Sequence, residues 1–164
     1  MKKLGPQETK ILKIAHLIFV MMWVIGVITM ALIYLTKPTS GDELYMSFRI
    51  MRLVDDFLVI PGAMLTTFTG ILYGTFTNWG FFKHRWIIIK WAVSLTIIIV
   101  GTFYLSPLLD DCLDIVNETR DAAMNNMTIS RYSHTTFICA CIQSAALIFL
   151  VIISVLKPWK KKRI

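Results

Sequence analysis

Ionisable side chains inside apolar stretches are the residues of this sequence best suited to chemistry. His16, Lys90 and His134 lie within long runs of apolar residues, and His84 stands just before the run that holds Lys90. Such groups are costly in an apolar setting and by default mark a functional site. A neutral imidazole is a common axial ligand of haem iron, and a lysine ammonium pairs with carboxylates. These residue types therefore predict a site for a ligand that carries a metal or carboxylates.

His16 belongs to a stripe of residues that favours a flat ligand. Trp23 and Met30 follow it at intervals of seven residues, close to two helical turns, so the three side chains lie on one helix face. Gly26 flanks this stripe, and its missing side chain lets a neighbouring backbone or a flat ligand approach. We expect His16 to ligate a haem iron and Trp23 to pack against the macrocycle. The alternative is a histidine at a membrane interface, bonded to a lipid headgroup or a backbone carbonyl.

Lys90 lies about one turn inside its apolar run, and none of the apolar runs contains an acidic residue to pair with it. The partner we expect is a bound anion, such as a propionate of haem or of another porphyrin. A substrate carboxylate held in this way would make Lys90 a catalytic residue. The alternative is a side chain that snorkels toward the aqueous boundary.

The second axial ligand of an iron on His16 has three candidates. His84 is expected at the same depth as His16, and the two are the predicted metal ligands. Met64, in the second apolar run, and a water molecule are the other candidates. His134 stands at the opposite end of its run and cannot share this iron, because a helix of about 24 residues rises roughly 36 Å.

Four long apolar runs must position these residues. They cover about residues 14–35, 57–82, 86–109 and 132–156, and each reaches the roughly 20 apolar residues that cross a bilayer core. The chain is 56% hydrophobic and 16% charged, with a mean hydropathy of +0.66. Soluble domains are nearer about 45–50% apolar and about 25% charged. The sequence thus predicts an all-α integral membrane four-helix bundle, a single domain over residues 1–164, and excludes a soluble enzyme.

Basic and acidic residues separate to opposite ends of these runs. One side holds the N-terminus, the loop between the second and third runs and the C-terminus, with eleven basic residues and one acid. The other side holds five basic residues and nine acids. Because cytoplasmic loops carry an excess of Lys and Arg, both termini are expected in the cytoplasm. The net charge of +7 then reflects topology and contact with anionic lipid, and not nucleic-acid binding.

Two segments on the acidic side are more than plain linkers. Residues 43–56 and 107–130 interleave apolar and charged side chains, as amphipathic helices at a membrane surface do. Pro107, preceded by Ser106, is typical of a helix start. We expect both segments to lie along the outer interface of the membrane.

Short motifs in three of the apolar runs resemble a known group of membrane proteins. In order they read K-x-x-H and W-x-x-G within 13–26, M-R-L at 51–53, I-P-G-A-M-L-T at 60–66, G at 70 and W-x-x-x-K at 86–90. Over roughly residues 10–95 they resemble HemJ-type protoporphyrinogen oxidases and the related copper-resistance D-type membrane domain. The chain departs from that pattern at Thr36-Lys37-Pro38, where those proteins carry an arginine and a Tyr-His pair. It departs again at Tyr104-Leu105, where they carry Tyr-His, so a sister family that shares the fold is the better match.

The resemblance implies a four-helix bundle that carries haem b and works in membrane redox chemistry. Its enzymatic form is an oxidoreductase of the protoporphyrinogen oxidase type, with a tetrapyrrole as substrate and a quinone or another membrane electron carrier as acceptor. A bacterial cytoplasmic membrane is the expected location. The residues expected to contact the cofactor are His16, Trp23, Gly26, Met64, His84 and Lys90.

Two other classes of function stay open at this point. The copper-resistance resemblance allows a copper-handling or transport component, because methionine is a soft ligand for copper(I). Met21, Met22 and Met30 form no Met-x-x-Met repeat, which lowers this alternative. The other alternative is a structural subunit without a cofactor, and association into homo-oligomers is left open.

Overall fold

The computed structural model describes residues 3–77, 80–82 and 84–156, and this part of the chain is helical and contains no strand. The elements in chain order are α1 (Pro6–Tyr34), α2 (Gly41–Val54), the π-helix η1 (Asp55–Val59), α3 (Ile60–Phe76), α4 (Arg85–Val100), the π-helix η2 (Gly101–Leu105), α5 (Ser106–Thr119), the 3₁₀-helix η3 (Arg120–Asn125) and α6 (Met127–Leu156). Local signals start the helices. Pro6 stands in the first turn of α1, where the Glu8 carboxylate accepts a hydrogen bond from the Gly5 N–H at 2.8 Å.

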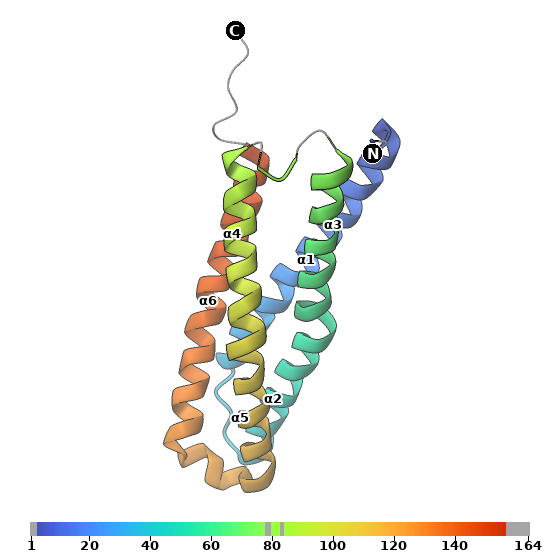
Figure 1. Cartoon of the computed structure of the whole chain (residues 1–164). Coiled ribbons are helices and arrows are strands. Elements are labelled where there is room, and N and C mark those ends of the chain that lie inside the picture. The colour runs from blue at the N-terminus through green and yellow to red at the C-terminus, as the bar shows by residue number, and fades with distance from the viewer. Residues whose placement is uncertain (1–2, 78–79, 83, 157–164) are drawn as a thin grey trace.

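Four helical stretches are long and apolar enough to cross a membrane: Pro6–Tyr34, Gly41–Phe76, Arg85–Asn125 and Met127–Leu156. The predicted all-helical fold with four long apolar helices is therefore confirmed. α1 begins and α6 ends at the same end of the bundle, the terminal end, whereas the connections after α1 and α5 lie at the other, the closed end (Figure 1). Insertion in a bilayer and the side on which the termini lie stay predictions.

The two segments expected as separate surface helices are helical, but they continue the long helices. α2 passes through η1 into α3 as one stretch of 36 residues, and α4 passes through η2 into α5 within a stretch of 41 residues. At 1.5 Å per residue a 36-residue helix is about 54 Å long, whereas a bilayer core is about 30 Å thick. The excess length stands at the closed end, along the axes of the long helices and not across them (Figure 1).

The second apolar run is helical only as far as Phe76, although its hydropathy extends to residue 82. Thr77 ends α3 in an extended conformation with φ −116° and ψ 171°. Phe81 and Phe82 belong to the connection that leads to α4, and residues 78 and 79 lie outside the described residues. Apolar character alone therefore did not mark the end of this helix.

Two clusters of buried side chains hold the elements together. The closed-end cluster joins α2, α5, η3 and α6 and consists of Phe48, Met51, Leu109, Cys112, Val116, Ala123 and Ile129. The central cluster joins α1, α3, α4 and α6 and consists of Trp23, Val27, Ala63, Ile97, Ala140 and Leu147. The apolar faces of α2 and α5 thus bury against each other, which explains why these segments do not lie flat on a surface.

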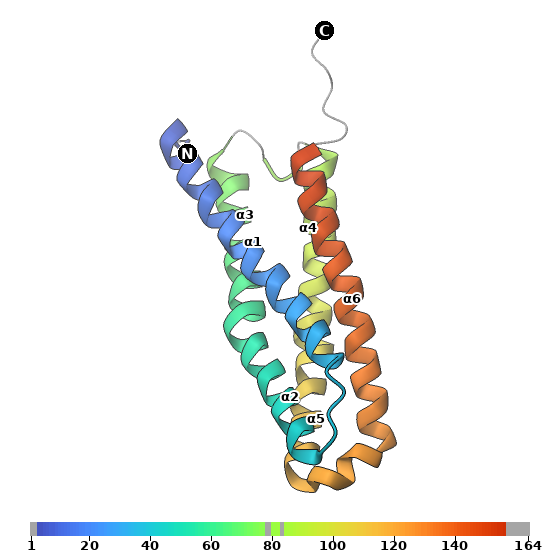
Figure 2. The ribbon, with the colours of Figure 1, turned by 180° about the vertical axis from the view of Figure 1, so that it is seen from behind.

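The helices form two pairs whose separation grows toward the terminal end. α1 packs along α3 and along α6, and α4 packs on α6. The second view shows α1 crossing the bundle obliquely, from α3 at the terminal end toward α6 at the closed end (Figure 2). The pair α1/α3 and the pair α4/α6 therefore diverge at the terminal end, where the predicted site residues His16 and Lys90 lie.

Candidate functional site

Close contacts between α1 and α3 at regular intervals set the position of His16. A Cβ built at Gly62 would lie 2.7 Å from the Trp23 nitrogen, and a Cβ built at Gly26 would lie 2.8 Å from a Val59 methyl carbon. The two antiparallel helices therefore approach almost to backbone contact at these points. Two helical turns nearer the terminal end, seven residues before Trp23 and seven after Gly62, His16 meets Thr69.

Hydrogen bonds to α3 hold the His16 imidazole. Its Nδ1 lies 2.8 Å from the hydroxyl oxygen of Thr69, a residue only 4% exposed. That hydroxyl lies 2.7 Å from the Leu65 carbonyl, to which it donates, so it accepts the Nδ1–H of His16. The backbone of Thr66 is a further hydrogen-bond partner of the imidazole. With the proton on Nδ1, Nε2 is the acceptor nitrogen of the ring.

Other polar groups of α3 surround the imidazole. The Tyr73 ring meets the His16 ring edge to face, with centroids 5.9 Å apart, and its hydroxyl donates to the Thr9 carbonyl at 3.3 Å. The hydroxyl of Thr66 is buried and makes no hydrogen bond to any described group. Thr66, Thr69 and Tyr73 share one face of α3 at spacings of three and four residues. We did not select these residues from the sequence, although this polar spacing inside an apolar run was a usable signal.

Lys90 lies on the opposite helix pair, with a neutral partner only. Its ammonium donates to the Ser154 hydroxyl of α6 at 2.7 Å, and that hydroxyl donates to the Leu150 carbonyl at 2.9 Å. All ion pairs found among the described residues lie elsewhere, on Arg52 and Arg120. The Lys90 ammonium lies close enough to His16 for its charge to act on the imidazole. Among the described residues no acidic side chain forms an ion pair with Lys90.

Aromatic rings lie between α3 and α4 near this site. A Cβ at Gly70 would lie 3.6 Å from the Trp91 ring, and a Cβ at Gly74 would lie 2.5 Å or less from the Phe81 ring. The Phe81 and Trp91 rings are 5.7 Å apart between centroids. Two glycines of α3 thus leave room for aromatic rings that come from α4 and from the connection before it.

Trp23 and Gly26, which we expected to contact a cofactor, serve helix packing. Trp23 is only 2% exposed and belongs to the central cluster, with its backbone against Gly62. At Gly26 the group that approaches is the backbone and side chain of Val59 on η1, and not an open surface for a flat ligand. Of the two uses expected for this glycine, close approach of a neighbouring backbone is the one observed.

Of the expected second ligands of a metal, Met64 is not brought to His16. Met64 is 67% exposed on the outer surface of α3, so it faces away from the bundle interior. His84 precedes the first turn of α4 and stacks on Trp86, with centroids 6.1 Å apart. No group of three or more His, Cys, Asp or Glu side chains that could hold a metal occurs in the part of the chain that the structure describes. His134, for which we expected no part in this site, meets Tyr34 edge to face at 5.9 Å.

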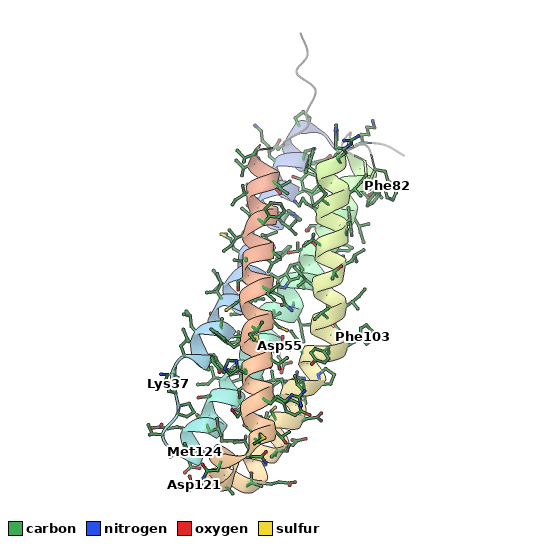
Figure 3. The ribbon with its side chains drawn as sticks, turned by 90° about the vertical axis from the view of Figure 1, so that its left-hand side faces the viewer. Lys37, Asp55, Phe82, Phe103, Asp121 and Met124 are labelled. Carbon is green, nitrogen blue, oxygen red and sulfur yellow. The ribbon has the colours of Figure 1, made fainter. Side chains whose placement is uncertain are left out.

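Sequence reasoning missed a second polar group inside the bundle. Asp55 was assigned to the acidic outer segment 43–56, but it is only 8% exposed. Figure 3 shows it within the outline of the bundle, whereas Phe103 projects from the side. Asp55 begins η1, where a π-helix replaces the regular helix, and no pattern in the sequence signals this.

No family model, curated protein or solved structure matches this chain. The resemblance of residues 10–95 to HemJ-type proteins therefore stays a prediction. Any assignment of chemistry to His16 and Lys90 rests on the geometry of their surroundings.

Proposed function

We propose that the terminal half of the bundle binds haem b, with His16 as an iron ligand and Lys90 as the partner of a haem carboxylate. The observation that carries this proposal is the hydrogen bond between His16 Nδ1 and Thr69. Histidines that ligate metals usually donate their other ring N–H to a fixed acceptor, which sets the tautomer and the ring orientation. Here Thr69 is that acceptor, so Nε2 is the nitrogen proposed to ligate iron.

Lys90 adds charge complementarity to this proposal. A lysine inside an apolar helix is costly unless an anion compensates it, and a serine hydroxyl carries no charge. Haem propionates are anionic and would supply the compensation. Because Lys90 comes from α4 and His16 from α1, a ligand between them would bridge the two helix pairs at the end where they diverge (Figure 1).

The residues that fit such a cofactor are fewer than the sequence suggested. His16, Thr69 and Lys90 fit, and the buried Thr66 hydroxyl offers a further donor without a partner among the described residues. Trp23, Gly26 and Met64 do not fit, because two of them pack inside helix contacts and the third faces outward. The second axial position is left without an assigned protein ligand.

A bound haem would supply one-electron transfer, which the side chains of the site cannot perform. The chain's contribution would be to fix the ligating nitrogen through Thr69 and to hold a carboxylate at Lys90. The proposed role is redox or tetrapyrrole chemistry in a bacterial cytoplasmic membrane, with the basic terminal end in the cytoplasm and a quinone as electron acceptor. The clustering of basic residues at that end supports the orientation.

The test is the visible absorption spectrum of the detergent-purified full chain, oxidised and reduced, after expression with ample haem. We expect a Soret band that shifts on reduction and is lost in His16→Ala. His134→Ala is the matched control, since it removes a histidine from the same bundle outside the proposed site. A colourless protein, or a Soret band unchanged in His16→Ala, would refute the proposal, and a colourless protein that retains copper(I) would favour the copper alternative.

A further inference from the structure

A small cavity lies inside the bundle, well away from His16. It holds about 40 Å³, and its polar lining comes from Asp55 on η1, Ser106 on α5, and Thr136 and Gln143 on α6. Val27 and Met30 of α1 are part of its apolar wall. A cavity needs roughly 10–15 Å³ of such space to hold a water molecule, so this one is large enough for water.

Both π-helices of the described chain border this cavity. Asp55 and Val59 of η1 line one side, and Gly101 and Leu105 of η2 line another. π-helical turns are rare and occur often at functional sites. A Cβ built at Gly101 would meet no atom within 4 Å, so the space beside this residue is open.

Asp55 is the most buried of three carboxylates that share one guanidinium. Arg52 lies 3.5 Å from Asp55, 3.6 Å from Asp56 and 3.2 Å from Asp110. It also donates to the Ser106 hydroxyl at 2.9 Å. The Asp56 and Asp110 side chains are 41% and 47% exposed, whereas that of Asp55 is 11% exposed. One positive charge cannot balance three negative ones. Asp55 is the most buried of the three carboxylates, so its negative charge is the most costly, and a proton on Asp55 removes that charge.

Among the residues that the structure describes, three other charged side chains face Asp55 from the elements packed around it. The charged groups that act on it are Arg52 of α2, Asp56 of η1 and Asp110 of α5. At the cavity α1 presents Val27 and α6 presents Thr136, neither of which titrates. Burial and the carboxylates of Asp56 and Asp110 therefore favour the protonated form of Asp55, whereas the Arg52 guanidinium and a hydrogen bond from the Ser106 hydroxyl favour the carboxylate.

The Gln143 side chain requires a partner that the described residues do not supply. Its amide nitrogen is buried and makes no hydrogen bond within the described part of the chain. A buried polar group without a partner is rare in folded proteins and usually bonds an internal water. Gln143 and Asp55 line the same cavity, so one water can accept from the amide and donate to the carboxyl.

We propose that Asp55 is a reversible proton-binding site inside the bundle, hydrated by water held between its carboxyl group and the Gln143 amide. The step is the addition of one proton from water to the carboxylate, and its release in reverse. This site is independent of the proposed haem site. Val27 lies eleven residues from His16 on α1, about 16 Å along the axis, and the central cluster with Trp23 and Leu147 lies between.

The test is the infrared carboxyl C=O stretch of the detergent-purified full chain, recorded over a pH titration in H₂O and in D₂O. At neutral pH we expect one protonated carboxyl per chain, with a band that shifts in D₂O. Asp55→Asn should abolish the band. Gln143→Leu keeps the acid but removes the bonded amide, and should shift the band. Asp114→Asn, on an exposed acid of α5, is the matched control and should leave the band unchanged.

Each other outcome would overturn part or all of the proposal. Absence of a protonated carboxyl band at neutral pH, or a band that survives in Asp55→Asn, removes Asp55 as the proton site. A band with the same position in Gln143→Leu removes the hydrated bridge. If Asp55→Asn does not fold, the Gln143→Leu shift in the folded protein decides, because that variant leaves the ion pairs of Arg52 in place.

Discussion

Replacing Gly62 by alanine should push α1 and α3 apart and weaken the fold. The new Cβ would lie 2.7 Å from the Trp23 nitrogen and 2.9 Å from its Cα, closer than real Cβ contacts come. Both obstacles are backbone atoms, so a helix must move and not merely a side chain. Overpacking of this kind costs about 1–3 kcal/mol, whereas a glycine-to-alanine change in a helix otherwise gains about 0.4–1 kcal/mol.

Gly101→Ala provides the control that isolates the steric cost. Gly101 also has helical backbone angles, with φ −59° and ψ −52°, but its Cβ would meet nothing within 4 Å. The gain from alanine is then similar in both variants and cancels in their difference. Gly62→Ala should therefore unfold more easily than Gly101→Ala by about 1–3 kcal/mol.

The assay is the free energy of unfolding in mixed micelles, from titration with a denaturing detergent followed by helix content. A Gly62→Ala protein as stable as Gly101→Ala would refute the close approach of α1 and α3. The same displacement should lengthen the bond between His16 and Thr69, two turns away, and weaken any ligand bound through His16. An unchanged ligand affinity in a destabilised Gly62→Ala protein would show that the two contacts are not linked.

Three further predictions concern single polar contacts. Thr69→Val leaves the His16 Nδ1–H without its acceptor and should weaken haem binding about 10–100-fold, measured by haem titration, whereas Thr69→Ser should keep it. Lys90→Met removes a cation whose partner is neutral, so we expect a higher thermal midpoint, equivalent to about 1–3 kcal/mol of added stability, and loss of ligand binding. A lower stability would show that the ammonium is well compensated without a ligand. Asp121→Asn weakens the acceptor that holds the first N–H of α2 at 2.6 Å and should cost about 1 kcal/mol in thermal unfolding, whereas Glu118→Gln on the exposed face of α5 should cost nothing measurable.

The long helices were predictable because their signal is local. An apolar run of more than 20 residues specifies a helix without reference to any partner, so the four long helices agree with prediction. The direction in which residues 43–56 continue depends on what their apolar face meets. Phe48 buries against α5 through the closed-end cluster, and a single sequence does not state that pairing.

The candidate site was predictable only as far as residue types allow. His16 and Lys90 stood out because ionisable groups are rare in apolar runs, and both lie inside the bundle with polar partners. Trp23 lies on a buried face of α1, but the seven-residue spacing of that face does not say whether a neighbouring helix or a ligand packs on it. Here α3 packs on it, with Gly62 against the Trp23 backbone. Asp55 was missed because its burial follows from η1 and from the pairing of α2 with α5.

The contact of Arg52 with Ser106 and Asp110 has a mechanical consequence for the whole bundle. It holds together the two longest helical stretches, Gly41–Phe76 and Arg85–Asn125, beside η1 and η2, and the closed-end cluster packs both together beyond that point. The free end of an elastic rod held at one end is displaced the most, so thermal displacement is largest at the terminal end, where the helix pairs diverge (Figure 1). Such collective bending occurs over microseconds to milliseconds. The spacing between His16 and Lys90 can therefore fluctuate while the closed-end cluster stays intact.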